Sequence, residues 1–407
     1  MLWDLNSNEM LDVEAAINPQ SIFGADVISR INFCNETPGN LGIMQNKIIG
    51  CFNDALVKLS DRNNIDLMRI YDATVVGNTT MSYLFLGVNP VSLARSPFAP
   101  VFCDAVQIGA KDMGIEINPC AEIYVLPNIA GHIGSDIIAD IISTDIKKKE
   151  GLNILIDVGT NGEIVLSHKD KILACSTAAG PAFEGASIYQ GMRAASGAVE
   201  GVQIINGEVS VKVIDAKDPI GICGSGLIDA IAEMLEVGII DKRGRMLDVE
   251  KSKGKEDIHE KLIERLRKGP KGNEFVLVWG KEGKPDVVIT QLDVREVQMA
   301  KGAIHAGINI LLKHIGKEAD SIDKLIFAGA FGSYIKVLSA LKIGLIPPIA
   351  KEKVISVGNA AGAGASMVLL SEKEREKAVD QARQIEHIEL AVRDDFQDEY
   401  LLAMNFT

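Results

Sequence analysis

The feature that most constrains this chain is the stretch 154–166, an apolar run that is broken by a short polar turn and then resumes. Val, Ile and Leu on both sides of the turn are typical of strands that are covered on both faces. Gly159 and Gly162 give the backbone freedom where side chains would block a close approach. The stretch therefore predicts a β-hairpin with an oxygen-rich tip.

The chemistry of this tip suits a phosphate group. Exposed backbone N–H groups and the Thr160 hydroxyl can donate to an anion, whereas Asp157 at the strand end is better suited to hold a hydrated Mg²⁺. Short glycine patterns also occur by chance in structural turns. The residues alone leave both interpretations open, a phosphate site and a plain hairpin.

Composition limits the classes of protein that fit. With 407 residues, of which 47% are hydrophobic, the chain can bury a large core in two or three domains. Its net charge of −13 argues against nucleic acid or an anionic membrane as the main partner. The first residues do not resemble a signal peptide, and no apolar run approaches the roughly 18 residues of a membrane span. We expect a cytoplasmic protein.

The cysteines are scattered, with no C-x-x-C pair. Neither a zinc site nor an iron–sulfur cluster is therefore predicted, and we expect free thiols and no redox centre in this chain. The cysteines are Cys34, Cys51, Cys103, Cys120, Cys175 and Cys223.

Near the start of the chain, residues 2–5 and 10–17 are predicted as strands of one sheet, and a helix is predicted from residue 24. Asp26 and Arg30 are four residues apart on one face of that helix, a spacing that favours a surface ion pair.

A buried strand is predicted over residues 73–76, followed at once by a polar turn and a helix. Asn78 or Thr79 in this turn can cap the helix, and a helix N-terminus can also bind an anion. Strand, polar turn and helix together indicate an α/β unit.

Small residues dominate two passages of the second half. Passage 178–186 is rich in Ala and Gly and lets its backbone come close to a helix or a ligand. The second passage, with Gly224, Ser225 and Gly226, leads directly into a predicted helix over 228–236. A glycine-rich turn that feeds a helix N-terminus is a candidate anion site.

The remaining stretch alternates helices and strands. Residues 242–272 are charged and predict a solvated excursion with a helix near 257–268. Residues 324–333 predict a buried strand that ends in a glycine loop, and a strand over 354–357 repeats this pattern. Such strand ends, separated by helices, indicate an α/β fold with ligand sites at the strand termini.

Seven passages taken in order resemble the ASKHA domain of the ATP-dependent reductive activators of corrinoid proteins. The resemblance is nearly end to end and includes the tail HIELAVRDDFQDEYLLAMNF. The passages are NPQ..GADVISRI, VVGNTTM, IDVGTNGEIVL, AAGPAFEGASI, GICGSGLIDA, FAGAFGSYI and VGNAAGAGAS.

The resemblance implies a two-lobed, actin-like α/β fold that binds ATP and Mg²⁺ in a cleft between its lobes. We expect a first lobe over 1–148, a second over 149–370 that includes the charged excursion, and a C-terminal tail over 371–407 that packs back on the lobes.

The resemblance also implies roles for particular residues. Asp157, Gly159, Thr160 and Asn161 match the second phosphate motif, with Asp157 near the metal. Gly329 and Gly332 match the adenosine motif, and residues 358–364 the helix that links the lobes. The candidate catalytic carboxylates are Asp157 and Asp26, and the other candidate nucleotide-binding residues are Asn78, Gly224, Ser225 and Gly226.

Two departures from the family pattern stand out. Family members carry a D-x-G-T strand just before the position where this sequence starts, so that residues 1–5 resemble the second strand of that hairpin and the first strand is missing. An open sheet edge of this kind favours pairing with another chain, including a homodimer. Family members also carry an iron–sulfur module elsewhere, so we expect the electron donor to be a separate domain or protein.

The function that the resemblance implies is ATP-dependent reduction of a Co(II) corrinoid protein to Co(I) in a methyltransferase system, with this chain as the ATPase and corrinoid-protein-binding module. Two alternatives stay open. A small-molecule kinase of the same superfamily would need a placed catalytic base, and none stands out in the sequence. A corrinoid-protein-binding module without ATPase activity is the other alternative.

Overall fold

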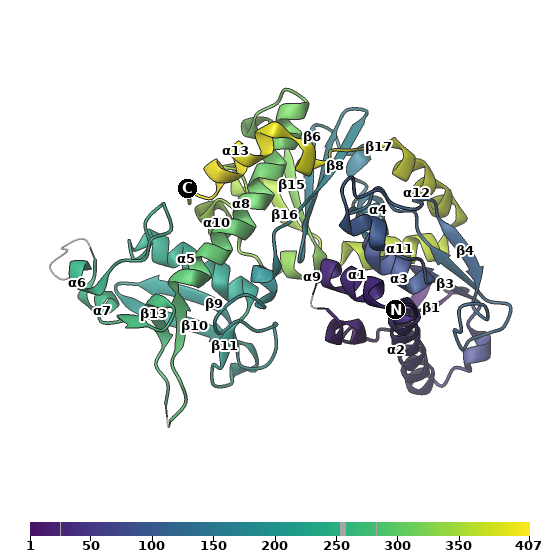
Figure 1. The fold of residues 1–407 in the computed structure, drawn as a ribbon, viewed down its shortest axis with the longest axis horizontal. Coiled ribbons are helices and arrows are strands. Elements are labelled where there is room, and N and C mark those ends of the chain that lie inside the picture. The colour runs from purple at the N-terminus through teal and green to yellow at the C-terminus, as the bar shows by residue number, and fades with distance from the viewer. Residues whose placement is uncertain (25, 253–257, 282) are drawn as a thin grey trace. The chain divides into compact units, whose positions relative to one another are not determined.

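The computed structural model describes residues 1–24, 26–252, 258–281 and 283–407 (Figure 1). The chain divides into two compact units. The first unit contains residues 1–149, 170–172 and 359–387, and the second contains 150–169, 173–358 and 388–407. The predicted lobes put 359–370 in the second lobe, whereas contacts within the chain group this segment with residues 1–149.

The first unit contains two separate small sheets. Strands β1 (Leu2–Asp4) and β2 (Glu9–Asp12) form an antiparallel pair, as predicted, although β2 ends well before residue 17. The second sheet has the order β3-β5-β4, with β3 (Asp72–Val75) parallel to β5 (Glu122–Val125) and β4 (Val106–Gly109) antiparallel to it.

The described part of the first unit also contains six α-helices, and two of them pack closely against each other. Gly364 of α11 lies so near α4 that an added Cβ would be 2.0 Å from the Ala139 carbonyl oxygen. The small residues of the predicted turn after residue 358 thus allow close helix packing. The helices are α1 (Val27–Glu36), α2 (Asn40–Asn63), α3 (Thr79–Leu86), α4 (Ser135–Thr144), α11 (Ala360–Leu370) and α12 (Glu372–Gln384), and strand β17 (Ile385–His387) follows α12.

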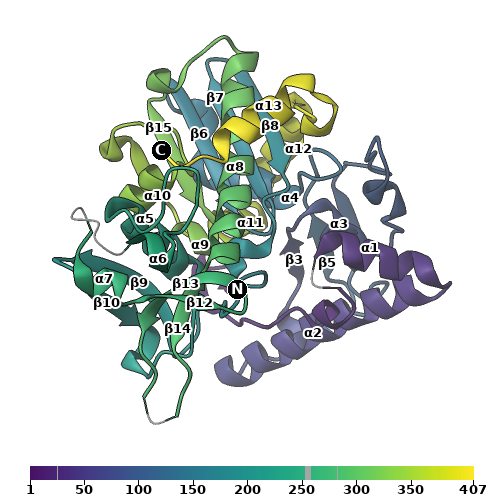
Figure 2. The same ribbon diagram turned by 60° about the vertical axis from the view of Figure 1, so that its left-hand side comes forward.

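The second unit is built on a mixed sheet in which strands run in the order β16-β15-β6-β7-β8. Strands β6 (Leu152–Val158) and β7 (Gly162–His168) form the predicted antiparallel hairpin, and β15 (Lys324–Ala328) pairs parallel to β6. Helix α8 (Gln291–His314) crosses this sheet (Figure 2). Strands β8 (Lys171–Thr177) and β16 (Val354–Ser356) complete this part.

Two three-stranded sheets and several helices complete the second unit. The sheets have the orders β10-β9-β11 and β12-β13-β14. Their strands are β9 (Ala198–Ile205), β10 (Glu208–Val213), β11 (Gly221–Ile222), β12 (Leu266–Gly269), β13 (Gly272–Val278) and β14 (Val287–Thr290). The helices are α5 (Gly224–Glu236), α6 (Val249–Ser252), α7 (Glu260–Ile263), α9 (Gly329–Gly332), α10 (Val337–Ile343) and α13 (Asp394–Ala403).

The helix predicted near 257–268 is wrong over most of its length. Helix α7 covers only Glu260–Ile263, and the chain then enters β12, where Leu266 pairs with Phe275 of β13. Residue 257 itself lies outside the described residues. Leu262 and Leu266 are both buried, so cross-strand packing has overridden the helical charge pattern.

Candidate functional site

The candidate site begins at the tip of the β6–β7 hairpin. Residues 159–161 form the turn, in which the Gly159 amide donates to the Asn161 carbonyl over 2.9 Å. The Thr160 hydroxyl donates to the carboxylate of Glu184, which ends the short 3₁₀ helix Pro181–Glu184. The tip therefore brings a hydroxyl and a carboxylate from two predicted passages together.

Asp157 lies beside the glycine that follows the neighbouring strand. It pairs in register with Ala328 of β15, so Gly329 comes directly after its partner. Gly329 has φ of +78°, and a Cβ added there would be 2.2 Å from Asp157 Oδ1. Only glycine tolerates both this backbone conformation and this contact. The carboxyl ends of β6 and β15 thus form a narrow space in which backbone and carboxylate meet.

This donor set suits a hydrated cation better than a fully protein-bound one. Within the described ranges, no group of three or more His, Cys, Asp and Glu side chains could hold a metal ion. Mg²⁺ typically keeps several waters and is bound by one or two carboxylates together with substrate phosphates. A single carboxylate at Asp157 fits that mode of binding.

A second part of the candidate site is a cavity of about 470 Å³ in the same unit. Ser225 at the start of α5 and the run Ser333, Tyr334 and Lys336 after Gly332 line it together with residues of β9 and β10. Two of the predicted glycine passages therefore open on one cavity. Tyr334 is 63% exposed and offers an aromatic face.

Ion pairs fix the charged groups around this cavity. Lys336 lies 2.5 Å from the buried carboxylate of Asp229, which also accepts from the Ser339 hydroxyl over 2.7 Å. Lys212 pairs with Glu200 over 2.8 Å, and this hydrogen bond raises the pKa of Lys212. Each of the two lysines is thereby paired with a carboxylate at the cavity wall.

The predicted glycines 224, 226 and 332 serve packing. A Cβ on Gly224 would be 2.0 Å from the Phe183 carbonyl oxygen, and one on Gly226 would be 2.1 Å from that of Val199. A Cβ on Gly332 would meet the Phe327 side chain at 3.1 Å. These glycines let backbones and side chains approach each other.

In the first unit, both polar candidates cap helices. Asn78 is the N-cap of α3 and accepts from the Met81 amide over 2.9 Å, which confirms the capping interpretation. Asp26 precedes α1 as its N-cap and accepts from the amide and hydroxyl of Ser29. Asp26 thus lies at the start of α1 and not within the helix, and its ion pair with Arg30 stays a prediction. The carboxylate stabilises a helix start.

Sequence reasoning missed three residues of this region. Glu184 is the only carboxylate of passage 178–186, and Tyr334 and Lys336 follow directly after the predicted adenosine glycines. A charged or aromatic residue next to a small-residue passage was the available signal. The glycines of these passages do not by themselves indicate which neighbouring side chains face the site.

Comparisons with known proteins first establish the class of fold. Residues 151–407 match the family described as the C-terminal domain of RACo, the ASKHA domain, and residues 1–149 match the RACo middle region. The ASKHA fold implies nucleotide binding. A solved structure titled reductive activator for corrinoid, iron–sulfur protein superposes with a TM-score of 0.87 at 36% identity, over 99% of this chain and 63% of that chain.

Two curated relatives give the same result. The corrinoid activation enzyme RamQ of Eubacterium limosum is 37% identical over all of this chain and 68% of its own length. The [Co(II) methylated amine-specific corrinoid protein] reductase of Methanosarcina barkeri is 28% identical over 84% of this chain and 64% of its own length. The chain thus spans about two thirds of these relatives.

This chain belongs to the family of reductive activators of corrinoid proteins. The predicted family and α/β ASKHA fold are confirmed. The roles of individual site residues stay predictions. None of the described helices has the length and apolar character to cross a membrane.

Proposed function

We propose that this chain is the ATPase and corrinoid-protein-binding module of an activator that returns a Co(II) corrinoid protein to Co(I) in a methyltransferase system. Its family membership and the names of its two curated relatives support this proposal. The observation that carries it is the Asp157 carboxylate beside Gly329 at the carboxyl ends of two parallel strands, a typical place for a ligand in an α/β sheet.

In this proposal, binding and hydrolysis of ATP with Mg²⁺ supply the free energy for an uphill reduction. Asp157 would hold the hydrated cation. The amides of Thr160 and Asn161 and the Thr160 hydroxyl would donate to phosphate oxygens. Glu184 accepts a hydrogen bond from the Thr160 hydroxyl in the structure, so it holds the hydroxyl until a phosphate oxygen competes for this hydrogen bond.

The adenosine part of the nucleotide is assigned to the cavity around Ser225 and Tyr334. Tyr334 would stack on the base, and Ser225, whose hydroxyl now donates to the Glu200 carbonyl over 2.9 Å, would bind the sugar. Glycines 329 and 332 keep the intervening backbone close to the sheet.

The reduction itself transfers one electron to Co(II). We propose that a low-potential iron–sulfur donor outside residues 1–407 supplies this electron, and that the reaction takes place in the cytoplasm. All six cysteines are free thiols in the structure, and burial raises the pKa of the Cys175 thiol. Iron and sulfide analysis of the purified chain tests this assignment, since a stoichiometric cluster would place the donor within it.

The test of the function is phosphate release with and without a Co(II) corrinoid protein. Stimulation by the corrinoid protein, lost in Asp157→Asn, is the expected result. A kinase would instead transfer the phosphoryl group to a small acceptor without needing the corrinoid protein. Binding of the corrinoid protein with no phosphate release would overturn the ATPase assignment and leave a binding module.

A further inference from the structure

The carboxylate of Glu184 reaches the candidate phosphate turn from a separate part of the chain. Glu184 is the only acidic residue of passage 178–186, and it accepts a hydrogen bond from the Thr160 hydroxyl. The two residues are 24 positions apart, so the tertiary fold brings them together. The contact places an exposed carboxylate at the turn whose amides and hydroxyl are assigned to phosphate oxygens.

Packing on both sides fixes the segment that carries Glu184. The buried ring of Phe183, in the same 3₁₀ helix, stacks on Phe331 with 5.7 Å between the ring centroids. Gly185 then turns the chain with φ of +80°, and a Cβ added there would be 2.7 Å from the Met192 amide nitrogen. The neighbours of Glu184 therefore have little freedom, which holds its carboxylate in one place beside the turn.

Hydrolysis of ATP needs a group that orients the attacking water and accepts its proton. Carboxylates perform this role when they lie within hydrogen-bond reach of the water beside the γ-phosphate. Once a phosphate oxygen takes the Thr160 hydroxyl, the Glu184 oxygen loses that donor and is left facing the phosphate group. A water molecule can then donate to Glu184 in place of the hydroxyl.

Two other carboxylates near the turn suit this role less well. Asp157 is assigned to the cation, and the charge of a bound cation lowers the proton affinity of the carboxylate that faces it. Glu163 pairs in register with Asp157 across the hairpin and accepts from the Ser176 hydroxyl over 3.5 Å. The partner of Glu163 thus belongs to β8, whereas Glu184 contacts the turn itself.

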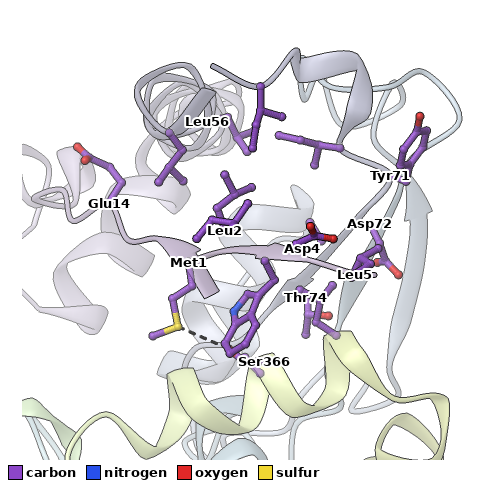
Figure 3. Close-up of a pocket in the computed structure, with 18 of the residues that line it drawn as sticks. Met1, Leu2, Asp4, Leu5, Glu14, Leu56, Tyr71, Asp72, Thr74 and Ser366 are labelled. Atoms are coloured by element: carbon purple, nitrogen blue, oxygen red, sulfur yellow. Dashed lines mark hydrogen bonds between the residues drawn. The ribbon is translucent and has the colours of Figure 1, made fainter. Parts of the chain in front are cut away.

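Two carboxylates around a cavity of the first unit are bound to cationic side chains. This cavity has a volume of about 710 Å³, and Figure 3 shows Glu14 and Asp72 among the residues that line it. Glu14 lies 2.5 Å from Arg62 and 3.1 Å from Lys58, and these hydrogen bonds lower its pKa. Asp72 lies 2.5 Å from Arg375. Glu14 is therefore a poor proton acceptor, and a guanidinium occupies Asp72.

We propose that Glu184 is the general base of ATP hydrolysis, an assignment that rests on the proposed ATPase function. Its carboxylate accepts a proton from the attacking water, whose oxygen forms a new bond to the γ-phosphorus. The bond from that phosphorus to the oxygen shared with the β-phosphate breaks, and ADP leaves with the electron pair of this bond. The products are ADP and inorganic phosphate, and Glu184 returns its proton to solvent, so the step needs no further reactant.

Glu184→Gln tests this assignment in the full chain, with a Co(II) corrinoid protein present. Gln keeps the size of the side chain and an oxygen that accepts from the Thr160 hydroxyl, but it cannot take a proton from water. We expect single-turnover phosphate release to slow at least about 100-fold, while the dissociation constant of ATP with Mg²⁺ changes less than about threefold. Calorimetric titration measures the binding. Because Glu184 is exposed, the melting temperature should stay near that of the wild type.

Two further variants and a pH profile separate a general base from a structural role. Glu163→Gln is the matched control, which removes the same charge from the neighbouring strand and should slow phosphate release less than about tenfold. Glu184→Asp keeps a proton acceptor on a shorter side chain and should restore part of the rate. The wild-type rate should fall in acid as the base becomes protonated, and the residual rate of Glu184→Gln should lack this fall.

The outcomes distinguish this assignment from the function on which it rests. A wild-type rate in Glu184→Gln would overturn the assignment and leave the ATPase function intact. A slow Glu163→Gln beside a normal Glu184→Gln would move the base to β7. If binding of ATP in Glu184→Gln weakened as much as the rate, Glu184 would be a binding residue and not the base. No phosphate release by the wild type with the corrinoid protein would overturn both the function and the assignment.

Discussion

Glycine serves different purposes in the two glycine-rich turns of the second unit. After β11, Gly224 and Gly226 let α5 lie directly against carbonyl oxygens of neighbouring backbone. After β15, Gly329 has a positive φ and lies against the Asp157 carboxylate. Both passages have the same pattern of strand, glycine turn and helix. Only the second places a glycine against a group that can bind a ligand.

The role of a glycine depends on the atoms that a side chain at its position would meet. At Gly226 the neighbour is the Val199 carbonyl, so substitution should damage the fold. At Gly159, in the candidate phosphate turn, the nearest atom would be 3.7 Å from an added Cβ, which is ordinary contact. Gly159, a candidate phosphate-binding glycine in the sequence, therefore has room for an added Cβ, whereas Gly226 has none.

The largest expected effect comes from Gly226→Ala. Gly226 lies in the buried helix α5, and a Cβ added there would be 2.1 Å from the Val199 carbonyl oxygen. We therefore expect the free energy of unfolding to fall by about 3 kcal/mol or more. Gly159→Ala is the matched control and should change stability by less than about 1 kcal/mol, in either direction. Urea denaturation of both variants provides the measurement. Equal losses of stability in the two variants would contradict the different roles assigned to Gly226 and Gly159.

Much of the fold followed from the sequence because the hydrophobic pattern is strong there. Strands β6, β7 and β15 are rich in Val, Ile and Leu, and they form where this apolar pattern predicts them. Over 257–268 prediction was poorer, because the charge pattern is helical while Leu266 is buried in a β ladder. The pairing of Thr160 with Glu184 was not predictable, since it joins residues 24 positions apart through tertiary structure.

Asp157→Asn should give the next largest effect, on binding instead of stability. Loss of the carboxylate removes the charge that orients the cation, so we expect Mg²⁺-dependent nucleotide affinity to fall at least about tenfold, or about 1.4 kcal/mol. The melting temperature should stay near that of the wild type. Calorimetric titration with and without Mg²⁺ measures both affinities. An unaltered Mg²⁺-dependent affinity would remove Asp157 from the site.

The stability of the second unit should depend on pH through Lys301, a buried residue outside the candidate site. Lys301 on α8 is buried, donates to the Asn405 carbonyl and lies 5.2 Å from the Phe406 ring centroid. Burial lowers its pKa to about 7. The unfolded chain, with a lysine pKa near 10.4, therefore binds more protons above pH 7, so stability should rise between pH 7 and pH 9.

We expect this rise to be on the order of 1–2 kcal/mol in the free energy of unfolding. Lys301→Met keeps the length of the side chain and removes the titration, so its stability should change much less over the same range. Denaturation at several pH values checks both proteins. His305 is no competing cause, because burial lowers its pKa from 6.5, below this window. The same slope in both proteins would exclude Lys301 as the cause.

The smallest expected effect tests whether the cavity after Gly332 belongs to the same site as Asp157. Tyr334 is largely exposed and lines that cavity, so Tyr334→Ala should leave the melting temperature unchanged. If the Tyr334 ring stacks on the base, Tyr334→Ala should weaken nucleotide binding by about 1–3 kcal/mol. Tyr334→Phe keeps an aromatic ring and should retain most of the wild-type affinity. Tripolyphosphate, which has no base, should bind the wild type and Tyr334→Ala equally. Equal losses for ATP and tripolyphosphate would mean that Tyr334 acts on the phosphate site and that the cavity does not hold the base.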